Sequence, residues 1–66
     1  MEIVLNGAPQ TLPAPCTIAR LLDDAGLGGR RVAVEVNGAI VPRGQHESRL
    51  LEPGDRIEIV HALGGG

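Results

Sequence analysis

Residues 31–42 of the chain read RVAVEVNGAIVP. Valine stands at alternate positions of residues 32–36, which is the period of a strand with one buried face. Asn37-Gly38 follows at once and favours a two-residue turn, because both central positions of a type I′ turn need a positive φ. Residues 39–41 then form a short return strand that ends at Pro42. Since proline cannot donate to a ladder, the stretch predicts a β-hairpin whose second strand lies at a sheet edge.

The N-terminal residues show the same pattern. A strand is predicted over residues 2–6, and Asn6-Gly7 supplies a second hairpin turn. The partner strand is expected over residues 10–14. Pro13 would lie inside this strand, which again predicts a sheet edge.

A helix is predicted between the two hairpins. Thr17 is a suitable N-cap, and Gly26 with Gly28 supplies the stop. Arg20 is expected to pair with Asp24, four residues further on. The apolar residues fall at i, i+3, i+4 and i+7, which is one face of a helix. They are Ile18, Leu21, Leu22 and Ala25.

Residues 56–63 are predicted to form the last strand, after a turn over residues 52–55. Alternation places its side chains on two opposite faces. The inward set is Ile57, Ile59, His61 and Leu63, and the outward set is Arg56, Glu58, Val60 and Ala62. His61 is therefore expected to be partly buried and hydrogen-bonded.

The element order ββ-α-ββ-β predicts an α+β fold, with a mixed sheet of about five strands and one main helix packed on one face. The proline-containing second and fourth strands take the edges. The first, third and fifth strands form the centre, with the two terminal strands parallel. We expect one domain over residues 1–63, followed by a flexible glycine tail over residues 64–66.

The composition excludes several classes of protein. The 66 residues carry a net charge of −2, with six Arg, no Lys and no aromatic residue, so the chain lacks the positive charge and stacking surfaces of a nucleic-acid binder. No apolar run approaches the roughly 20 residues that span a membrane. One cysteine cannot cross-link a small secreted fold, so we expect a cytoplasmic protein.

The most informative feature is the triglycine Gly64-Gly65-Gly66. Glycine has no Cβ, so this segment could enter a narrow channel in another protein and present a carboxylate there. A carboxylate is a poor electrophile, and transfer onto the α-phosphate of ATP would activate it. The chain has no phosphate-binding G-x-x-x-x-G-K-[ST] loop, so the ATP site must lie on a partner. We expect no catalytic residue and no bound cofactor in this chain.

Three segments carry a resemblance to a known family. They are Asn6-Gly7, the hairpin around Val36-Asn37-Gly38, and the last thirteen residues from Gly54 to Gly66. With the overall pattern they resemble the β-grasp, ubiquitin-like sulfur carrier proteins of thiamine biosynthesis, the ThiS family.

The resemblance implies a function for the tail. Gly66 would be adenylated by an E1-like adenylyltransferase and converted to a thiocarboxylate, with Gly64 and Gly65 as the threading segment. The sulfur would come from a donor of the cysteine desulfurase type. A thiazole synthase would use it to build the thiazole ring.

The outward face of the central strands suggests where partners dock. Four apolar residues alternate away from the helix-facing set, and as neighbours they would form a modest apolar patch of the kind that marks an interface. They are Val4, Ala33, Val60 and Ala62.

Other residue types carry weaker signals. Cys16 lies beside the predicted helix N-terminus, but a packed thiol is the simpler interpretation. His46 and His61 have no Cys or carboxylate at metal-ligand spacing, so no metal site is predicted.

Other functions remain open at this stage. A related β-grasp carrier could serve molybdopterin synthase as its small subunit, cysteine synthesis or tRNA thiolation, although the length and the tail favour thiamine. A ubiquitin-type conjugation module would instead join the same terminus to a target lysine. A plain interaction domain would use neither reaction.

Overall fold

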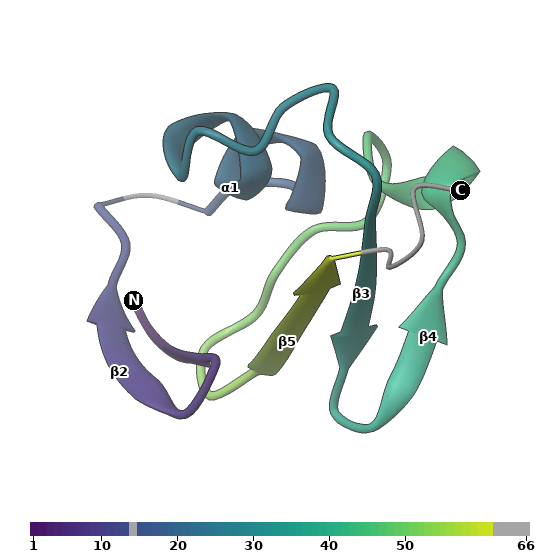
Figure 1. Cartoon of the computed structure of the whole chain (residues 1–66). Helices are drawn as coiled ribbons and strands as arrows, with labels where there is room; N and C mark the ends of the chain where they lie inside the picture. Colours follow the sequence, from purple (N-terminus) through teal and green to yellow (C-terminus); the bar gives the residue numbers. More distant parts are fainter. Residues whose placement is uncertain (14, 62–66) are drawn as a thin grey trace.

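The computed structural model describes residues 1–13 and 15–61. Its elements are β1 (Glu2–Leu5), β2 (Ala8–Thr11), α1 (Ile18–Asp24), β3 (Val32–Val36), β4 (Ala39–Val41), the 3-10 helix η1 (Arg43–Gln45) and β5 (Arg56–His61). The strands form one sheet in the order β2-β1-β5-β3-β4, with α1 packed over one face (Figure 1). β1 and β5 are parallel, and the other neighbours are antiparallel. The predicted α+β fold, its edges and its parallel terminal strands are confirmed.

Both Asn-Gly turns have the predicted backbone. Asn6 and Gly7 have φ values of 50° and 82°, and Asn37 and Gly38 have 53° and 86°. Asparagine and glycine tolerate this left-handed region better than other residues. The two dipeptides therefore fix both hairpin registers, in which Leu5 faces Ala8 and Val36 faces Ala39.

The prediction for β2 was wrong in its bounds. The strand covers Ala8–Thr11 instead of residues 10–14, so the proline inside it is Pro9 and not Pro13. Because the two-residue turn pairs Leu5 with Ala8, the next pair is Val4 with Pro9. In an antiparallel ladder that pair exchanges no hydrogen bonds, so the missing N–H of Pro9 costs the sheet nothing. Ala14, the predicted strand end, lies outside the described residues.

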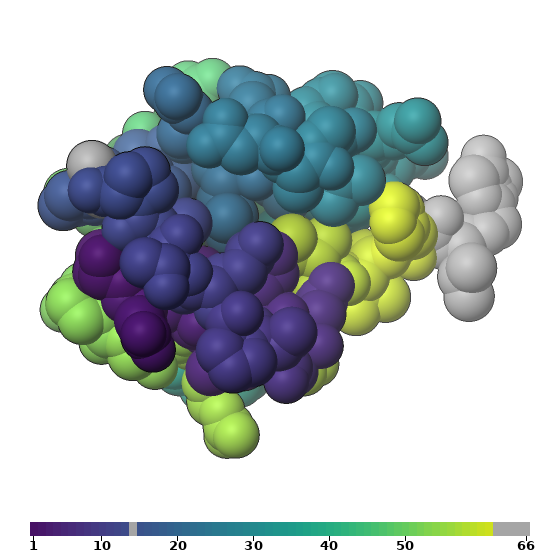
Figure 2. All heavy atoms as spheres, turned by 90° about the vertical axis from the view of Figure 1, so that its left-hand side faces the viewer, coloured from purple at the N-terminus to yellow at the C-terminus, as the bar shows by residue number. Residues whose placement is uncertain are grey.

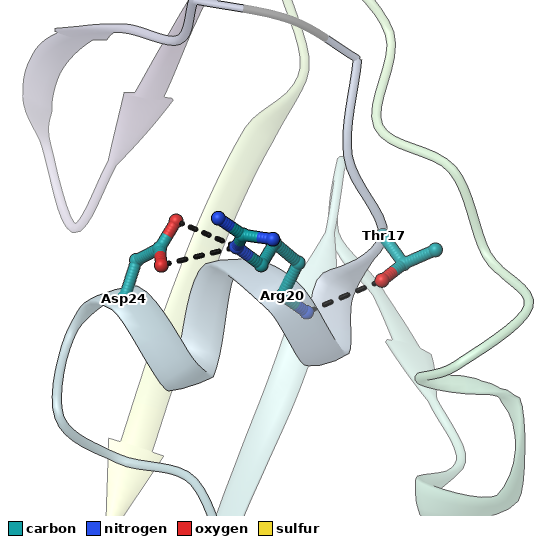
Figure 3. Close-up of polar contacts among 3 residues, drawn as sticks. All are labelled: Thr17, Arg20 and Asp24. Atoms are coloured by element: carbon teal, nitrogen blue, oxygen red, sulfur yellow. Dashed lines mark hydrogen bonds and ion pairs between the residues drawn. The ribbon is translucent and has the colours of Figure 1, made fainter.

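The predicted cap and ion pair of α1 are both present. The Thr17 side-chain oxygen accepts from the backbone N–H of Arg20 at 3.2 Å, and the Arg20 Nε lies 3.1 Å from Asp24 Oδ1 (Figure 3). Ile18, Leu21 and Leu22 are buried as predicted. Ala25 is exposed, which corrects the fourth position of the stripe. It is the C-cap and precedes Gly26 at φ 76°, so its side chain has left the helix face.

The core lies between α1 and the inner face of the sheet. Among the residues that the structure describes, nine apolar ones are buried there: Ile3, Ile18, Leu21, Leu22, Val34, Val36, Val41, Leu51 and Ile57. Burial falls along β5, from Ile57 at 1% exposure through a half-buried Ile59 to an exposed His61. A seven-residue helix is about 10 Å long, whereas a six-residue strand is about 20 Å long. The end of β5 therefore extends past the helix, and the predicted burial of His61 was wrong.

His46 is the buried histidine of the fold. The residue is 7% exposed, and its Nε2 lies 3.0 Å from the carbonyl oxygen of Val41. Its own carbonyl oxygen accepts from the N–H of Ala19 in α1 at 2.9 Å. His46 thus connects the end of β4 to the first turn of the helix, a structural role that its sequence position did not reveal.

Candidate functional site

β5 is the element that leads to the predicted functional tail. It lies at the centre of the sheet, between β1 and β3, and the chain continues from His61 into residues 62–66. Ala62, Gly64, Gly65 and Gly66, which the sequence singled out, lie outside the described residues, as does Leu63. The geometry of the site is therefore that of the strand before the tail and of the sheet face around it.

The start of β5 is held by a buried carboxylate. Asp55 is 7% exposed and accepts two hydrogen bonds, from Asn37 Nδ2 at 3.0 Å and from the backbone N–H of Glu52 at 2.8 Å. Asn37 Oδ1 in turn accepts from the N–H of Arg56 at 3.0 Å. Because buried polar groups are costly without partners, this closed set of bonds fixes the β3–β4 turn against the start of β5.

The other end of β5 is held by the first hairpin turn. β1 pairs with β5 at only two positions, Val4 with Arg56 and Leu5 with Ile57. Beyond them, Asn6 Oδ1 accepts from the N–H of Ile59 at 2.7 Å. The Asn-Gly pattern indicated turns at Asn6 and Asn37 but not these side-chain bonds, because they join residues far apart in the chain.

The outward face brings together only part of the predicted patch. Val60 is 53% exposed and faces Ala33, also exposed, in the β3–β5 register. Val4 faces Arg56 instead, four residues before Val60 on the same strand, which is about 13 Å. Val60 and Ala33 are therefore neighbours, and Val4 lies apart from them.

Two acidic residues separate Val4 from Val60. Glu58 faces Glu35 directly across the β3–β5 ladder, and Glu35 faces Ile40 on β4. Ile40 is 61% exposed, and the sequence analysis did not select it. Its alternation with the inward Val41 was the signal that could have found it. The outer face thus combines apolar side chains with a centre of negative charge.

The remaining candidates do not join this face. Cys16 is partly buried and packs against the core, and its carbonyl oxygen accepts from the N–H of Leu51 at 2.9 Å. Across residues 1–13 and 15–61, no three His, Cys, Asp or Glu side chains are grouped as metal ligands would be. The same part of the chain has no helix long and apolar enough to cross a membrane.

Comparison with known proteins gives close matches over the whole length. The chain is 44% identical to a thiazole synthase of Magnetococcus marinus and 39% identical to one of Paramagnetospirillum magneticum, each over all 66 residues. It spans only about a fifth of the length of these two relatives. A stretch resembling this chain is therefore part of a larger thiazole synthase polypeptide in both organisms.

A solved structure and a family model agree with these relatives. The crystal structure of the thiamine biosynthesis protein ThiS from Geobacter metallireducens superimposes with a TM-score of 0.86 at 28% identity, covering all of both chains. The five-stranded sheet with its single packed helix is thus the β-grasp fold of that protein. The model of the ThiS family matches residues 3–66, a range that includes the terminal glycines. The chain belongs to the ThiS family.

Proposed function

We propose that this chain is a sulfur carrier of thiamine biosynthesis that works through the carboxylate of Gly66. The observation that carries the proposal is the ThiS family match over residues 3–66, since it includes the triglycine as well as the domain. The whole-length likeness to thiamine biosynthesis protein ThiS supports the same function. In this proposal the chain is the substrate of partner enzymes and supplies no catalytic side chain of its own.

The proposed chemistry has two steps. The Gly66 carboxylate attacks the α-phosphorus of ATP on an E1-like adenylyltransferase, an acyl-adenylate forms, and pyrophosphate leaves. Sulfide, released by a reducing thiol from the persulfide of a donor of the cysteine desulfurase type, then attacks the carbonyl carbon, and the thiol is oxidised to a disulfide. The C–S bond forms as AMP leaves. Because glycine has no Cβ, residues 64–66 can bring this carbonyl through a narrow channel to the nucleotide.

We propose that a thiazole synthase uses the sulfur carried by this chain. The two thiazole synthases that match this chain contain a stretch like it within one polypeptide. Covalent linkage raises the effective concentration of one module at another, which would benefit two modules that act in one reaction. Where the carrier and the thiazole synthase are separate chains, they would have to bind each other through a docking surface.

A reconstitution tests the proposed pathway. The chain is incubated with its cognate adenylyltransferase, ATP and a sulfur donor, and then with thiazole synthase and its sugar-phosphate substrate. We expect thiazole product in proportion to the chain supplied. Product from molybdopterin or tRNA thiolation enzymes, but none from thiazole synthase, would instead assign the chain to another sulfur pathway.

The docking surface is proposed around Val60 and Ala33. These neighbouring apolar side chains lie on the outward face of β3 and β5, and β5 continues into the tail, so a partner that receives the tail would also contact them. Ala62, which alternation places on the same face, is included in this proposal. Val4 lies on the other side of Glu58 from Val60, so it would contact the partner only at the margin of the docking surface.

Val60→Asp is expected to weaken binding to the adenylyltransferase by about tenfold or more, because it places a charge in the apolar centre of the contact. Val60 is already exposed, so the fold should survive. Binding is measured by calorimetry, and folding by circular dichroism. Leu50→Asp is the matched control, since Leu50 is equally exposed but lies beside Thr17 at the start of α1. Equal binding by the two variants would contradict the proposed surface.

A further inference from the structure

Asn6 and Asn37 are equivalent residues in two equivalent turns. Each has a φ near 50° and is followed by a glycine with a φ above 80°. The side-chain oxygen of each accepts a hydrogen bond from a backbone N–H of β5: Asn37 Oδ1 from Arg56 at 3.0 Å and Asn6 Oδ1 from Ile59 at 2.7 Å. They differ in position, because Arg56 begins β5 and Ile59 lies near its end.

The bond from Asn6 replaces a ladder bond that β1 cannot provide. β1 ends at Leu5, and its last backbone bond to β5 runs from the Asn6 N–H to the Ile57 carbonyl oxygen at 2.8 Å. The next acceptor on that side would have to come from a strand that has already turned away. The Asn6 side chain supplies it instead, and Figure 2 shows the purple N-terminal hairpin lying against the yellow end of β5.

The bond from Asn6 determines how far along β5 the strand is hydrogen-bonded on both its β1 side and its β3 side. On the β3 side, pairing continues as far as His61. On the β1 side, it would stop at Ile57 without Asn6, leaving the last four residues of the strand held by one neighbour. With Asn6, both sides are held up to Ile59, two residues before the last described residue. His61 is exposed and Ile59 only half-buried, so packing contributes little to holding this end.

We propose that Asn6 is a positioning residue for the C-terminal segment. Its side chain fixes the direction in which β5 leaves the sheet, and thereby the direction in which residues 62–66 are offered to the partner enzyme. A narrower range of directions in the free chain lowers the ordering cost of binding, which is the general effect of preorganisation. This role rests on the proposed function, because it matters only if the tail is the part that reacts.

Asn6→Gly tests the proposal, with Asn37→Gly as the matched control. Glycine adopts the positive φ of both turns freely, so each variant keeps its turn and loses its side-chain bonds. The control loses more, since Asn37 also donates to Asp55. At a temperature where circular dichroism shows both variants folded, Asn6→Gly is expected to lower kcat/KM for adenylation about fivefold, the value of one typical hydrogen bond. Asn37→Gly should stay within about twofold of wild type, because Arg56 is far from the tail.

Two further readouts separate positioning from stability. Asn6→Asp keeps an acceptor oxygen and should restore most of the lost activity. Amide hydrogen exchange at Ile59 should accelerate about fivefold in Asn6→Gly and not in Asn37→Gly, and this measurement needs no enzyme. Equal kcat/KM for the two glycine variants, or unchanged exchange at Ile59, would overturn the role of Asn6. A wild-type chain that is not adenylated at all would overturn the proposed function and this role together.

Discussion

Removal of Gly66 is expected to abolish adenylation while leaving the fold intact. The deletion places the terminal carboxylate one residue, or about 3.5 Å, short of its proposed position. Since misplacement by about 1 Å can cost a hundredfold in rate, pyrophosphate release should fall by at least about a hundredfold. The measurement is pyrophosphate release with the adenylyltransferase and ATP, at saturating chain concentration.

The deletion of Gly66 should leave the stability of the fold unchanged. Among residues 1–13 and 15–61, the last buried core residue is Ile57, and the last partly buried one that packs against the core is Ile59. The urea midpoint of the shortened chain should therefore equal that of the full chain. Adenylation at the wild-type rate without Gly66 would show that the reactive carbonyl lies elsewhere and would remove the basis of the proposed function.

Ile57→Ala is expected to remove a large part of the stability of the fold. Ile57 is 1% exposed at the centre of the sheet, and such a truncation costs about 2–5 kcal/mol through lost burial and an unfilled cavity. A 66-residue domain has a total stability of roughly 3–10 kcal/mol, so the variant should be partly unfolded at 37 °C. Urea denaturation at 25 °C measures the loss.

Ile40→Ala provides the matched control. It removes the same atoms from another strand, but Ile40 is 61% exposed, so its cost should stay below about 1 kcal/mol. The difference between the two variants isolates burial from strand propensity. Similar losses in both would mean that the core is not where the structure places it.

The overall fold was predictable because its signals are local. Asn6-Gly7 and Asn37-Gly38 specify two hairpins, and the prolines after or inside the return strands specify the edges. Once β2 and β4 are edges and pair with β1 and β3, the place left for β5 at the centre of the sheet is between β1 and β3, where it runs parallel to β1.

What the sequence did not reveal depends on contacts between distant residues. Asn6 and Ile59 are separated by 53 positions, so no local pattern shows that the turn residue also holds the last strand. The buried histidine was assigned to His61 by alternation alone, because alternation describes a face and not where the covering helix ends. His46 lies in a loop without periodicity, and it is buried where it bonds to the end of β4 and to the first turn of α1.

The two faces of the sheet were predictable from the sequence, but the layout of the outer face was not. Alternation correctly assigned Val60 and Ala33 to one face, where the register makes them neighbours. It could not show that Val4 would be offset by four residues along β5, since the register of two parallel strands is set by their connections. The acidic pair of Glu35 and Glu58 and the exposed Ile40 follow from the same register.

The central claim is that the terminal carbonyl of this chain carries sulfur, and intact-mass spectrometry tests it most directly. The full chain is incubated with the adenylyltransferase, ATP and a sulfur donor, and its mass is compared with that of a sample lacking ATP. Exchange of one oxygen for sulfur should add about 16 Da, and fragmentation should place the gain on Gly66. An unchanged mass beside an active adenylyltransferase, or a gain located on Cys16, would contradict the account.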